Sequence, residues 1–206
     1  MGRSNTKGST FERWFCRRLT TWWTKDDESD VLWWRTSQSG GRATARLKKG
    51  KETIRAHCGD ISAVHEQGRS LTDLITFELK RGYAKATIHD LLDAGAGAAE
   101  QTYAAWIAQA AASAAAANTP YWMVVHQRPR REPLILTPVA VVRAVAPRAE
   151  AAQHARVQIA VGGYDVFVSQ LEAFLAEARP ALVQQHARIH SGRAAPRLLR
   201  QPVKES

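Results

Sequence analysis

One stretch constrains the fold more than any other, because it combines a regular alternation with charge. It runs over residues 57–83, with the sequence H-C-G-D-I-S-A-V-H-E-Q-G-R-S-L-T-D-L-I-T-F-E-L-K-R-G-Y. Every second residue from Ile75 to Leu79 is apolar, while Glu78 and Lys80 occupy alternate positions. Side chains on a strand repeat every two residues. The pattern therefore predicts a strand with one apolar face and one face that presents a carboxylate beside an ammonium.

A second extended segment precedes this strand and carries the acidic residue Asp60. We expect strands over residues 53–64 and 71–80, joined by a turn at 68–70. If they pair as a hairpin, Asp60 comes near Glu78. Two close carboxylates repel each other unless a cation lies between them, and Mg²⁺ takes a few oxygen ligands and keeps several waters. The simpler interpretation is a solvated strand face, because short acidic-x-basic strings are common by chance.

The charge of the chain indicates an anionic partner. The 206 residues can bury one sizeable core, alone or with a small annex. The formal net charge is +10, and residues 1–59 carry thirteen Lys and Arg against six Asp and Glu. Nucleic acid is the simplest anionic partner for such a chain. The alternative is a charge that serves solubility, but the excess is not spread evenly.

Cysteine usage and hydropathy indicate a reducing compartment and no membrane. Cys16 and Cys58 form no metal-binding spacing, so we expect two small buried thiols. The first residues lack the apolar run of a signal peptide. The long uncharged stretch at 101–122 is mostly alanine, which favours a helix but is weakly apolar. We therefore expect a cytoplasmic protein.

The first helix is predicted to begin at a capping box formed by Ser9 and Glu12 and to run to about residue 23. Its apolar residues share one arc of the helix, and Arg13 and Arg17 lie opposite. The members of the arc are Phe11, Phe15, Cys16, Leu19, Trp22 and Trp23. Glu12 falls inside the arc. It is either a capping residue in the exposed first turn or a carboxylate that reaches the same pocket as Asp60 and Glu78.

A basic segment follows a short predicted strand at residues 31–36. Residues 37–41 break the strand, and residues 42–51 contain five basic side chains after two glycines. Glycines allow close approach of the backbone to a ligand, and the basic side chains suit phosphates. A mobile solvated loop is the alternative, and the two interpretations are compatible, since such a loop can become ordered on DNA.

The remaining pattern predicts an α/β domain with a central mixed sheet flanked by helices. A short helix is expected at 87–93, an alanine-rich helix at 98–117, and a strand covered on both faces at 121–126. Another strand is expected at 134–136, with a short helix to residue 145. A hairpin follows at 157–168, with its turn at 162–164. Ser169 and Glu172 predict a second capping box and a helix through residue 178. Residues 181–206 are expected to be a flexible basic tail.

Several short motifs occur in a specific order over residues 7–83. They are Lys7-Gly8, Glu12-Arg13, Arg35, Ser37-Gln38-Ser39-Gly40, Gly59-Asp60-Ile61 and Phe77-Glu78-Leu79-Lys80. This series resembles the motifs of the archaeal-type Holliday junction resolvases and their phage relatives, which belong to the PD-(D/E)XK nuclease superfamily. The resemblance implies a restriction-endonuclease-like core in a single nuclease domain over residues 1–180, with the motif core at 7–126.

The resemblance also implies roles for individual residues. Metal ligands would be Glu12, Asp60 and Glu78, binding Mg²⁺ or Mn²⁺, and Lys80 would orient or activate the attacking water. Ser39 and Arg35 would act near the scissile phosphate. The expected DNA-binding residues are Arg13, Arg35, Arg42, Arg46, Lys48 and Lys49. The implied activity is hydrolysis of phosphodiester bonds in DNA, with four-way junctions as the substrate.

The chain departs from the minimal resolvases in length, in the arm at 40–46, and in its tryptophan pairs at 22–23 and 33–34. We interpret the tryptophans as core residues rather than base-stacking platforms. These departures leave two alternatives to a junction resolvase open. One is a restriction-type or phage DNA-processing nuclease without junction specificity, and the other is a non-catalytic DNA-binding protein on a nuclease fold. A symmetric homodimer is expected if junction resolution, which needs two paired nicks, is the function.

Overall fold

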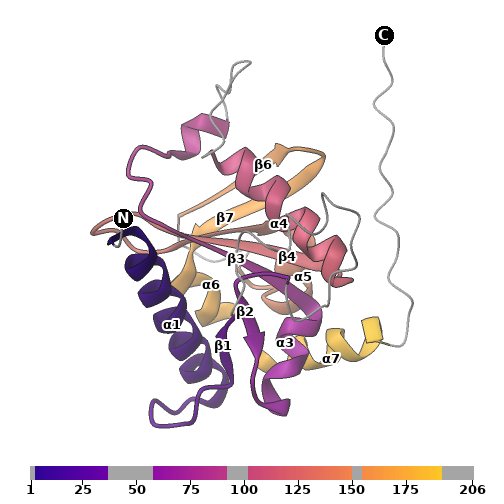
Figure 1. Cartoon of the computed structure of the whole chain (residues 1–206). Helices are drawn as coiled ribbons and strands as arrows, with labels where there is room; N and C mark the ends of the chain where they lie inside the picture. Colours follow the sequence, from indigo (N-terminus) through magenta and orange to yellow (C-terminus); the bar gives the residue numbers. More distant parts are fainter. Residues whose placement is uncertain (1–2, 37–57, 92–101, 150–154, 192–206) are drawn as a thin grey trace.

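A five-stranded mixed sheet forms the centre of the molecule (Figure 1). The computed structural model describes residues 3–36, 58–91, 102–149 and 155–191. The strand order is β3-β4-β5-β7-β6, in which β3 and β4 are parallel and the other neighbours antiparallel. The strands are β3 (Ile75–Arg81), β4 (Tyr121–Gln127), β5 (Leu134–Pro138), β6 (Arg156–Val161) and β7 (Tyr164–Gln170). The predicted fold class, a mixed sheet flanked by helices, is confirmed.

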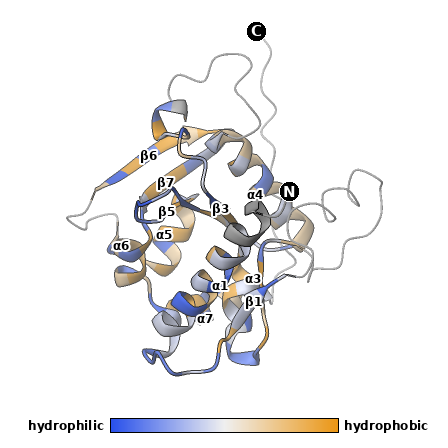
Figure 2. Ribbon diagram, turned by 60° about the vertical axis from the view of Figure 1, so that its left-hand side comes forward, coloured by the Kyte–Doolittle hydropathy of each residue, from blue (hydrophilic) through white to orange (hydrophobic). Residues whose placement is uncertain are grey.

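Helices cover both faces of the sheet (Figure 1). One face packs against α4 (Tyr103–Ala117) and the 3₁₀ turn η3 (Ile88–Leu91). The other face packs against α1 (Arg3–Thr24), α3 (Arg69–Leu74), α5 (Val139–Val145), α6 (Leu171–Glu177) and α7 (Pro180–Ser191). Figure 2 shows apolar residues along the strands between these layers and hydrophilic residues on the outer turns. The sheet therefore has a core on each side.

The alternation predicted for β3 is present in the structure. Ile75, Phe77 and Leu79 are buried in the core that contains α1. Glu78 and Lys80 lie on the other face, where they meet α4. Because β3 is an edge strand of the large sheet, its outer backbone edge is available to another segment.

The predicted hairpin between residues 53–64 and 71–80 is wrong. The preceding strand is only β2 (Ile61–Ala63), and it pairs antiparallel with β1 (Trp33–Arg35) in a separate two-stranded sheet. A 3₁₀ turn, η2 (Glu66–Gly68), and α3 lie between β2 and β3. Leu71 and Leu74 are both buried at helical spacing, so the two-residue alternation begins only at Ile75. Residues 53–57 lie outside the described residues.

The first helix is longer than the capping box predicted. It begins at Arg3, so Ser9 lies inside it and cannot be its N-cap. Gly8 costs a helix only about 1 kcal/mol relative to alanine, which does not stop it. The apolar arc is confirmed: Phe11, Phe15, Cys16, Leu19, Trp22 and Trp23 are all buried. Glu12 therefore stands on the third turn, next to this buried face.

Two expectations for the C-terminal third also need correction. Ser169 belongs to β7, where it pairs with Ile135, so the N-cap of α6 is Gln170 and no capping box forms. Residues 180–191 form α7 instead of part of a tail, because Val183 and Ala187 are buried in the core one helical turn apart. Residues 192–206 lie outside the described residues.

The other predicted elements agree with the structure. The alanine-rich helix is α4, which begins at Tyr103 after the N-cap Thr102 and not at residue 98. Its small side chains let it pack closely on the sheet, and the hairpin at residues 162–163 joins β6 to β7. Cys16 and Cys58 are buried free thiols, and burial raises the pKa of Cys16 to about 12. Among the described helices, none combines the length and apolar character needed to cross a bilayer.

Candidate active site at the edge strand

Glu78 and Lys80 form a close pair on β3. The Lys80 Nζ donates to Glu78 Oε1 at 2.7 Å, and Glu78 is 3% exposed. Gln109 of α4 bridges the two. Its Nε2 donates to Glu78 Oε1 at 2.7 Å, and its Oε1 accepts from Lys80 Nζ at 3.0 Å. The side-chain amide thus fixes both members of the pair, because both of its ends are hydrogen-bonded.

Asp60 reaches the same place by docking on the free edge of β3. Its backbone N–H donates to the carbonyl of Phe77 at 2.9 Å, and its Oδ2 accepts from the N–H of Leu79 at 2.6 Å. The end of β1 supports it from the other side, where the N–H of Thr36 donates to the Asp60 carbonyl at 2.9 Å. The predicted proximity of Asp60 to Glu78 is therefore right, although the predicted hairpin is not its cause.

The electrostatics of Asp60 reflect this position. Burial, followed by the charge of the nearby Glu78 carboxylate, raises the pKa of Asp60 well above its usual value. The Leu79 N–H and Lys80 act in the opposite direction and do not reverse the shift. Buried like charges are costly at close range, so a cation at this position would be favoured.

Glu12 on α1 is paired with Arg35 on β1, and its carboxylate interacts electrostatically with Glu78. Arg35 Nε on β1 lies 3.3 Å from Glu12 Oε2, so the two form an ion pair. The same Glu12 oxygen is buried and makes no hydrogen bond. Burial raises the pKa of Glu12, Arg35 lowers it, and the charge of Glu78 raises it further. The electrostatic effect of Glu78 on Glu12 indicates that the helix carboxylate lies near Glu78.

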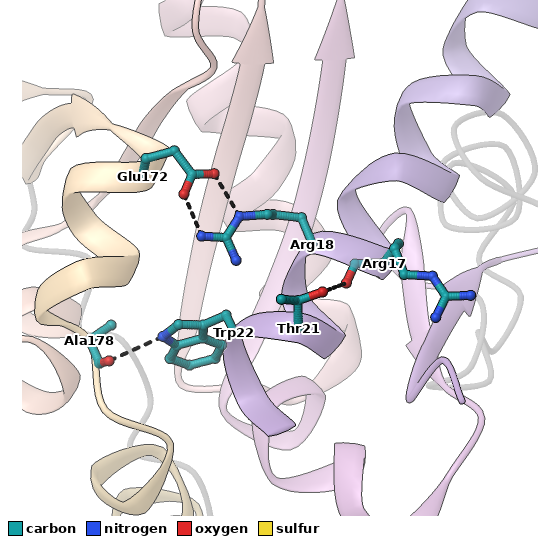
Figure 3. Close-up of polar contacts among 6 residues, drawn as sticks. All are labelled: Arg17, Arg18, Thr21, Trp22, Glu172 and Ala178. Atoms are coloured by element: carbon teal, nitrogen blue, oxygen red, sulfur yellow. Dashed lines mark hydrogen bonds and ion pairs between the residues drawn. The ribbon is translucent and has the colours of Figure 1, made fainter. Parts of the chain in front are cut away.

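The position of Glu12 depends on how α1 is held. Figure 3 shows the anchoring of α1 to α6 and to the residue after it. The Arg18 guanidinium makes two hydrogen bonds to the Glu172 carboxylate, one of them at 2.8 Å. The indole Nε1 of Trp22 donates to the carbonyl of Ala178 at 3.2 Å. These contacts fix the C-terminal half of the helix, while Glu12 lies in its N-terminal half.

The donor set fits a divalent cation. In the described part of the chain, no group of three or more His, Cys, Asp or Glu side chains is arranged to hold a metal ion. The three-carboxylate ligand set of Glu12, Asp60 and Glu78 therefore stays a prediction. Two observations still fit a metal: the raised pKa of Asp60 beside Glu78, and the Glu12 oxygen that makes no hydrogen bond. A pair of carboxylates with water completing the shell is an ordinary Mg²⁺ site.

The predicted DNA-binding residues fall into two groups. Arg13 is exposed on α1, and Arg35 is half-buried in its ion pair with Glu12. Ser39 and the basic residues of the arm lie outside the described residues, so their predicted roles stay predictions. These basic residues are Arg42, Arg46, Lys48 and Lys49.

The tryptophan pairs are mostly core residues, as expected. Trp22, Trp23 and Trp33 are buried, and Trp34 is 42% exposed.

Gln109 is the site residue that the sequence did not reveal. Gln101, another amide near the start of the same alanine-rich segment, lies outside the described residues. The signal in the sequence is a lone amide in an alanine-rich helix, next to the buried face that contains Trp106 and Ala110. That signal could not identify its partners, because they lie on a strand about thirty positions earlier.

One comparison with known proteins finds a match over most of the chain. A family model described as "Phage putative PDDEXK endonuclease" matches residues 3–185. No curated protein and no solved structure gives a significant match. Members of the PD-(D/E)XK superfamily generally use divalent metals. Because the match covers most of the 206 residues, this chain belongs to the phage PDDEXK endonuclease family of the PD-(D/E)XK superfamily.

Proposed function

We propose that the protein is a divalent-metal-dependent DNA endonuclease whose reaction centre is built on β3. The observation that carries the proposal is the docking of Asp60 onto the strand that presents Glu78 and Lys80, with the Asp60 Oδ2 2.6 Å from the Leu79 N–H. Asp60 and Glu78 would hold the cation, Mg²⁺ or Mn²⁺. When bound, the cation would lower the pKa of a water ligand and offset the charge that develops on the phosphate.

Lys80 has a positioning role in this proposal. An ammonium has three N–H donors, and in the described part of the chain two of those on Lys80 go to Glu78 and Gln109. The third can hold the attacking water or a phosphate oxygen. Because Gln109 and Glu78 fix the direction of Nζ, the remaining donor is aimed before substrate arrives, which lowers the cost of organising the transition state.

Glu12 and Arg35 have complementary tasks. The Glu12 oxygen without a hydrogen bond can accept from a water near the cation. Arg35 is 37% exposed at its side chain, so its guanidinium can contact a phosphate while it still balances Glu12. Arginine is suited to this double contact, because its planar group carries five donors.

Branched DNA is the proposed substrate, supported by the motif order over residues 7–83. Linear duplex is the second candidate, because the description of the matching family names an endonuclease without a junction. If the substrate is branched DNA, we expect a symmetric dimer, since two paired nicks need two reaction centres.

The test compares a labelled four-way junction with linear duplex, each in Mg²⁺, in Mn²⁺ and in EDTA. Glu78→Ala should abolish cleavage and keep DNA binding, because it removes a metal ligand but no basic residue. Glu132→Ala, at an exposed glutamate before β5, is the matched control and should cleave like wild type. Paired nicks at the junction would support a resolvase. Equal cutting of both substrates would remove junction selectivity, and no cutting in any metal would remove the nuclease proposal.

A further inference from the structure

Tyr83 has an unusual backbone conformation beside the proposed reaction centre. Its φ is +47°, in the left-handed region that bulky residues rarely adopt. It directly follows Gly82, whose φ is +99°. The ring is 39% exposed, although large aromatic side chains are generally buried. A strained residue that displays an aromatic ring suggests a role for that ring outside the core.

Three hydrogen bonds hold the turn that contains Tyr83. The N–H of Gly82 donates to the carbonyl of Gln127 at 3.0 Å, and the N–H of Ala86 donates to the carbonyl of Tyr83 at 2.9 Å. His126 supplies the third, since its Nε2 lies 3.1 Å from the Gly82 carbonyl. A carbonyl can only accept, so Nε2 carries the proton. The His126 side chain is only 1% exposed, and its hydrogen bond fixes this turn.

The same histidine is fixed in turn by α4. Its Nδ1 lies 2.8 Å from the Tyr103 hydroxyl, which donates because the neutral ring has no second proton. Burial lowers the pKa of His126 and so favours the neutral ring. The chain of contacts from Tyr103 through His126 to Gly82 makes the strained turn rigid.

The ring of Tyr83 contacts two residues that neighbour the Lys80 end of β3 in the fold. It packs against the indole of Trp106 with centroids 5.0 Å apart and planes at 61°, and its centroid is 6.2 Å from that of His126. His126 is the register partner of Lys80 on the neighbouring strand. Trp106 precedes Gln109 by one turn of α4, and Gln109 contacts Lys80. Two residues thus link the exposed ring to the surroundings of Lys80: His126 on the neighbouring strand and Trp106 on the helix that carries Gln109.

We propose that Tyr83 is a stacking platform for a base next to the scissile phosphate. This inference rests on the proposed nuclease function and adds a contact that positions the substrate. Aromatic side chains bind bases without regard to sequence, because every base has a π-face. The ring packs against Trp106 and His126 and remains 39% exposed, so its exposed part is free to meet a nucleotide next to the phosphate site. An unpaired base at a branch point or strand end could stack there without first being unstacked.

A purely structural role for Tyr83 would give a different result in experiments. The β6–β7 turn provides a matched comparison in Tyr164. This residue also follows a glycine with positive φ, and its ring packs edge-on against a buried tryptophan, Trp122, at 5.5 Å. It lies in the hairpin at the opposite edge of the sheet from β3. Loss of this ring should therefore affect stability alone.

The experiment uses Tyr83→Asn, because asparagine tolerates the left-handed backbone and has no ring. Tyr83→Phe keeps the ring and should behave like wild type, and Tyr164→Asn is the control. Binding is measured in the Glu78→Ala background with DNA that carries 2-aminopurine at single positions around the branch point. Stacking quenches its fluorescence. We expect Tyr83→Asn to weaken binding roughly 5- to 150-fold and to remove the quenching at one position.

Thermal unfolding separates folding from binding. Wild-type affinity and quenching in Tyr83→Asn would overturn the inference, as would an equal loss of affinity in Tyr164→Asn. A large loss of stability in Tyr83→Asn with unchanged affinity would show that the ring is only a structural element. Failure of the nuclease proposal looks different, because wild-type protein would then cleave no DNA in any metal, whatever the effect of Tyr83 on binding.

Discussion

Substitution of Gly59 by alanine tests how Asp60 is held on β3. Gly59 has a φ of +78°, and a Cβ there would lie 3.0 Å from the backbone carbonyl oxygen of Phe77 and 2.9 Å from Thr76 Cγ2. The Phe77 oxygen cannot move without distorting β3, since it accepts from the Asp60 N–H. Thr76 cannot turn away freely either, because its hydroxyl is hydrogen-bonded to that of Thr119 at 2.6 Å.

The expected loss of stability has two separable parts. The left-handed backbone costs an alanine about 1–2 kcal/mol. Close contact in a packed interior costs about 1–3 kcal/mol more, so Gly59→Ala should lower the free energy of unfolding by about 2–5 kcal/mol. Gly163 provides the control. Its φ is +82° and no atom lies within 4 Å of the position that a Cβ would occupy there, so Gly163→Ala should lose only the first part.

Urea unfolding and a cleavage assay together test this prediction. Gly59→Ala should also cleave DNA about a hundredfold more slowly, because displacement of a reacting group by about 1 Å has an effect of that order. Gly163→Ala should cleave at the wild-type rate. Equal destabilisation by the two variants would refute the role of the close contact. Full cleavage by a destabilised Gly59→Ala protein would refute the claim that this glycine positions Asp60.

Three further predictions follow from the contacts described above. Gln109→Ala should slow cleavage about 10- to 100-fold with little change in DNA binding, because Lys80 loses the amide that directs it. Gln109→Glu, measured in the same assay, should not recover the wild-type cleavage rate. Burial lowers the pKa of His126, so its contribution to stability should be complete above pH 6.5 and decrease as the pH falls toward the folded-state value; urea unfolding of His126→Gln should show a flatter pH dependence. Breaking the partly exposed Arg18–Glu172 pair with Glu172→Gln should lower the free energy of unfolding by less than about 1 kcal/mol. Cleavage should be unchanged, because the Trp22–Ala178 hydrogen bond still holds α1.

The parts of the site that the sequence predicted are those that depend on local periodicity. The two-residue alternation of β3 determined which face carries Glu78 and Lys80, and the 100° spacing of α1 placed Glu12 inside its apolar arc. Both patterns arise within one element, so no knowledge of neighbouring elements is needed. The error at residues 71–74 occurred because Leu71 and Leu74 are compatible with a short strand as well as with one turn of helix.

The parts that could not be predicted depend on docking between distant elements. Gln109 meets Lys80 only because α4 crosses the sheet above β3, and the sequence does not specify that crossing. Asp60 attaches to the outer edge of β3 through a hydrogen bond from the Leu79 N–H. The sequence pattern predicted a hairpin instead, because a hairpin is the simplest way to bring two carboxylates together. The packing of α7 was missed for a related reason. Its buried face consists of Val183 and Ala187, too few apolar residues to reveal a helix.

The charge balance of the site connects its stability to its proposed chemistry. Glu12 is paired with Arg35, and Glu78 is paired with Lys80. Asp60 has no ion pair of its own among the described residues, and burial together with Glu78 raises its pKa. Such a carboxylate costs stability when it is ionised, and groups of this kind are typical of reaction centres. A divalent cation between Asp60 and Glu78 would attract both carboxylates and so offset their mutual repulsion. Metal binding and folding should therefore be linked, so the edge of β3 is least stable in the metal-free protein and gains stability when the proposed cofactor binds.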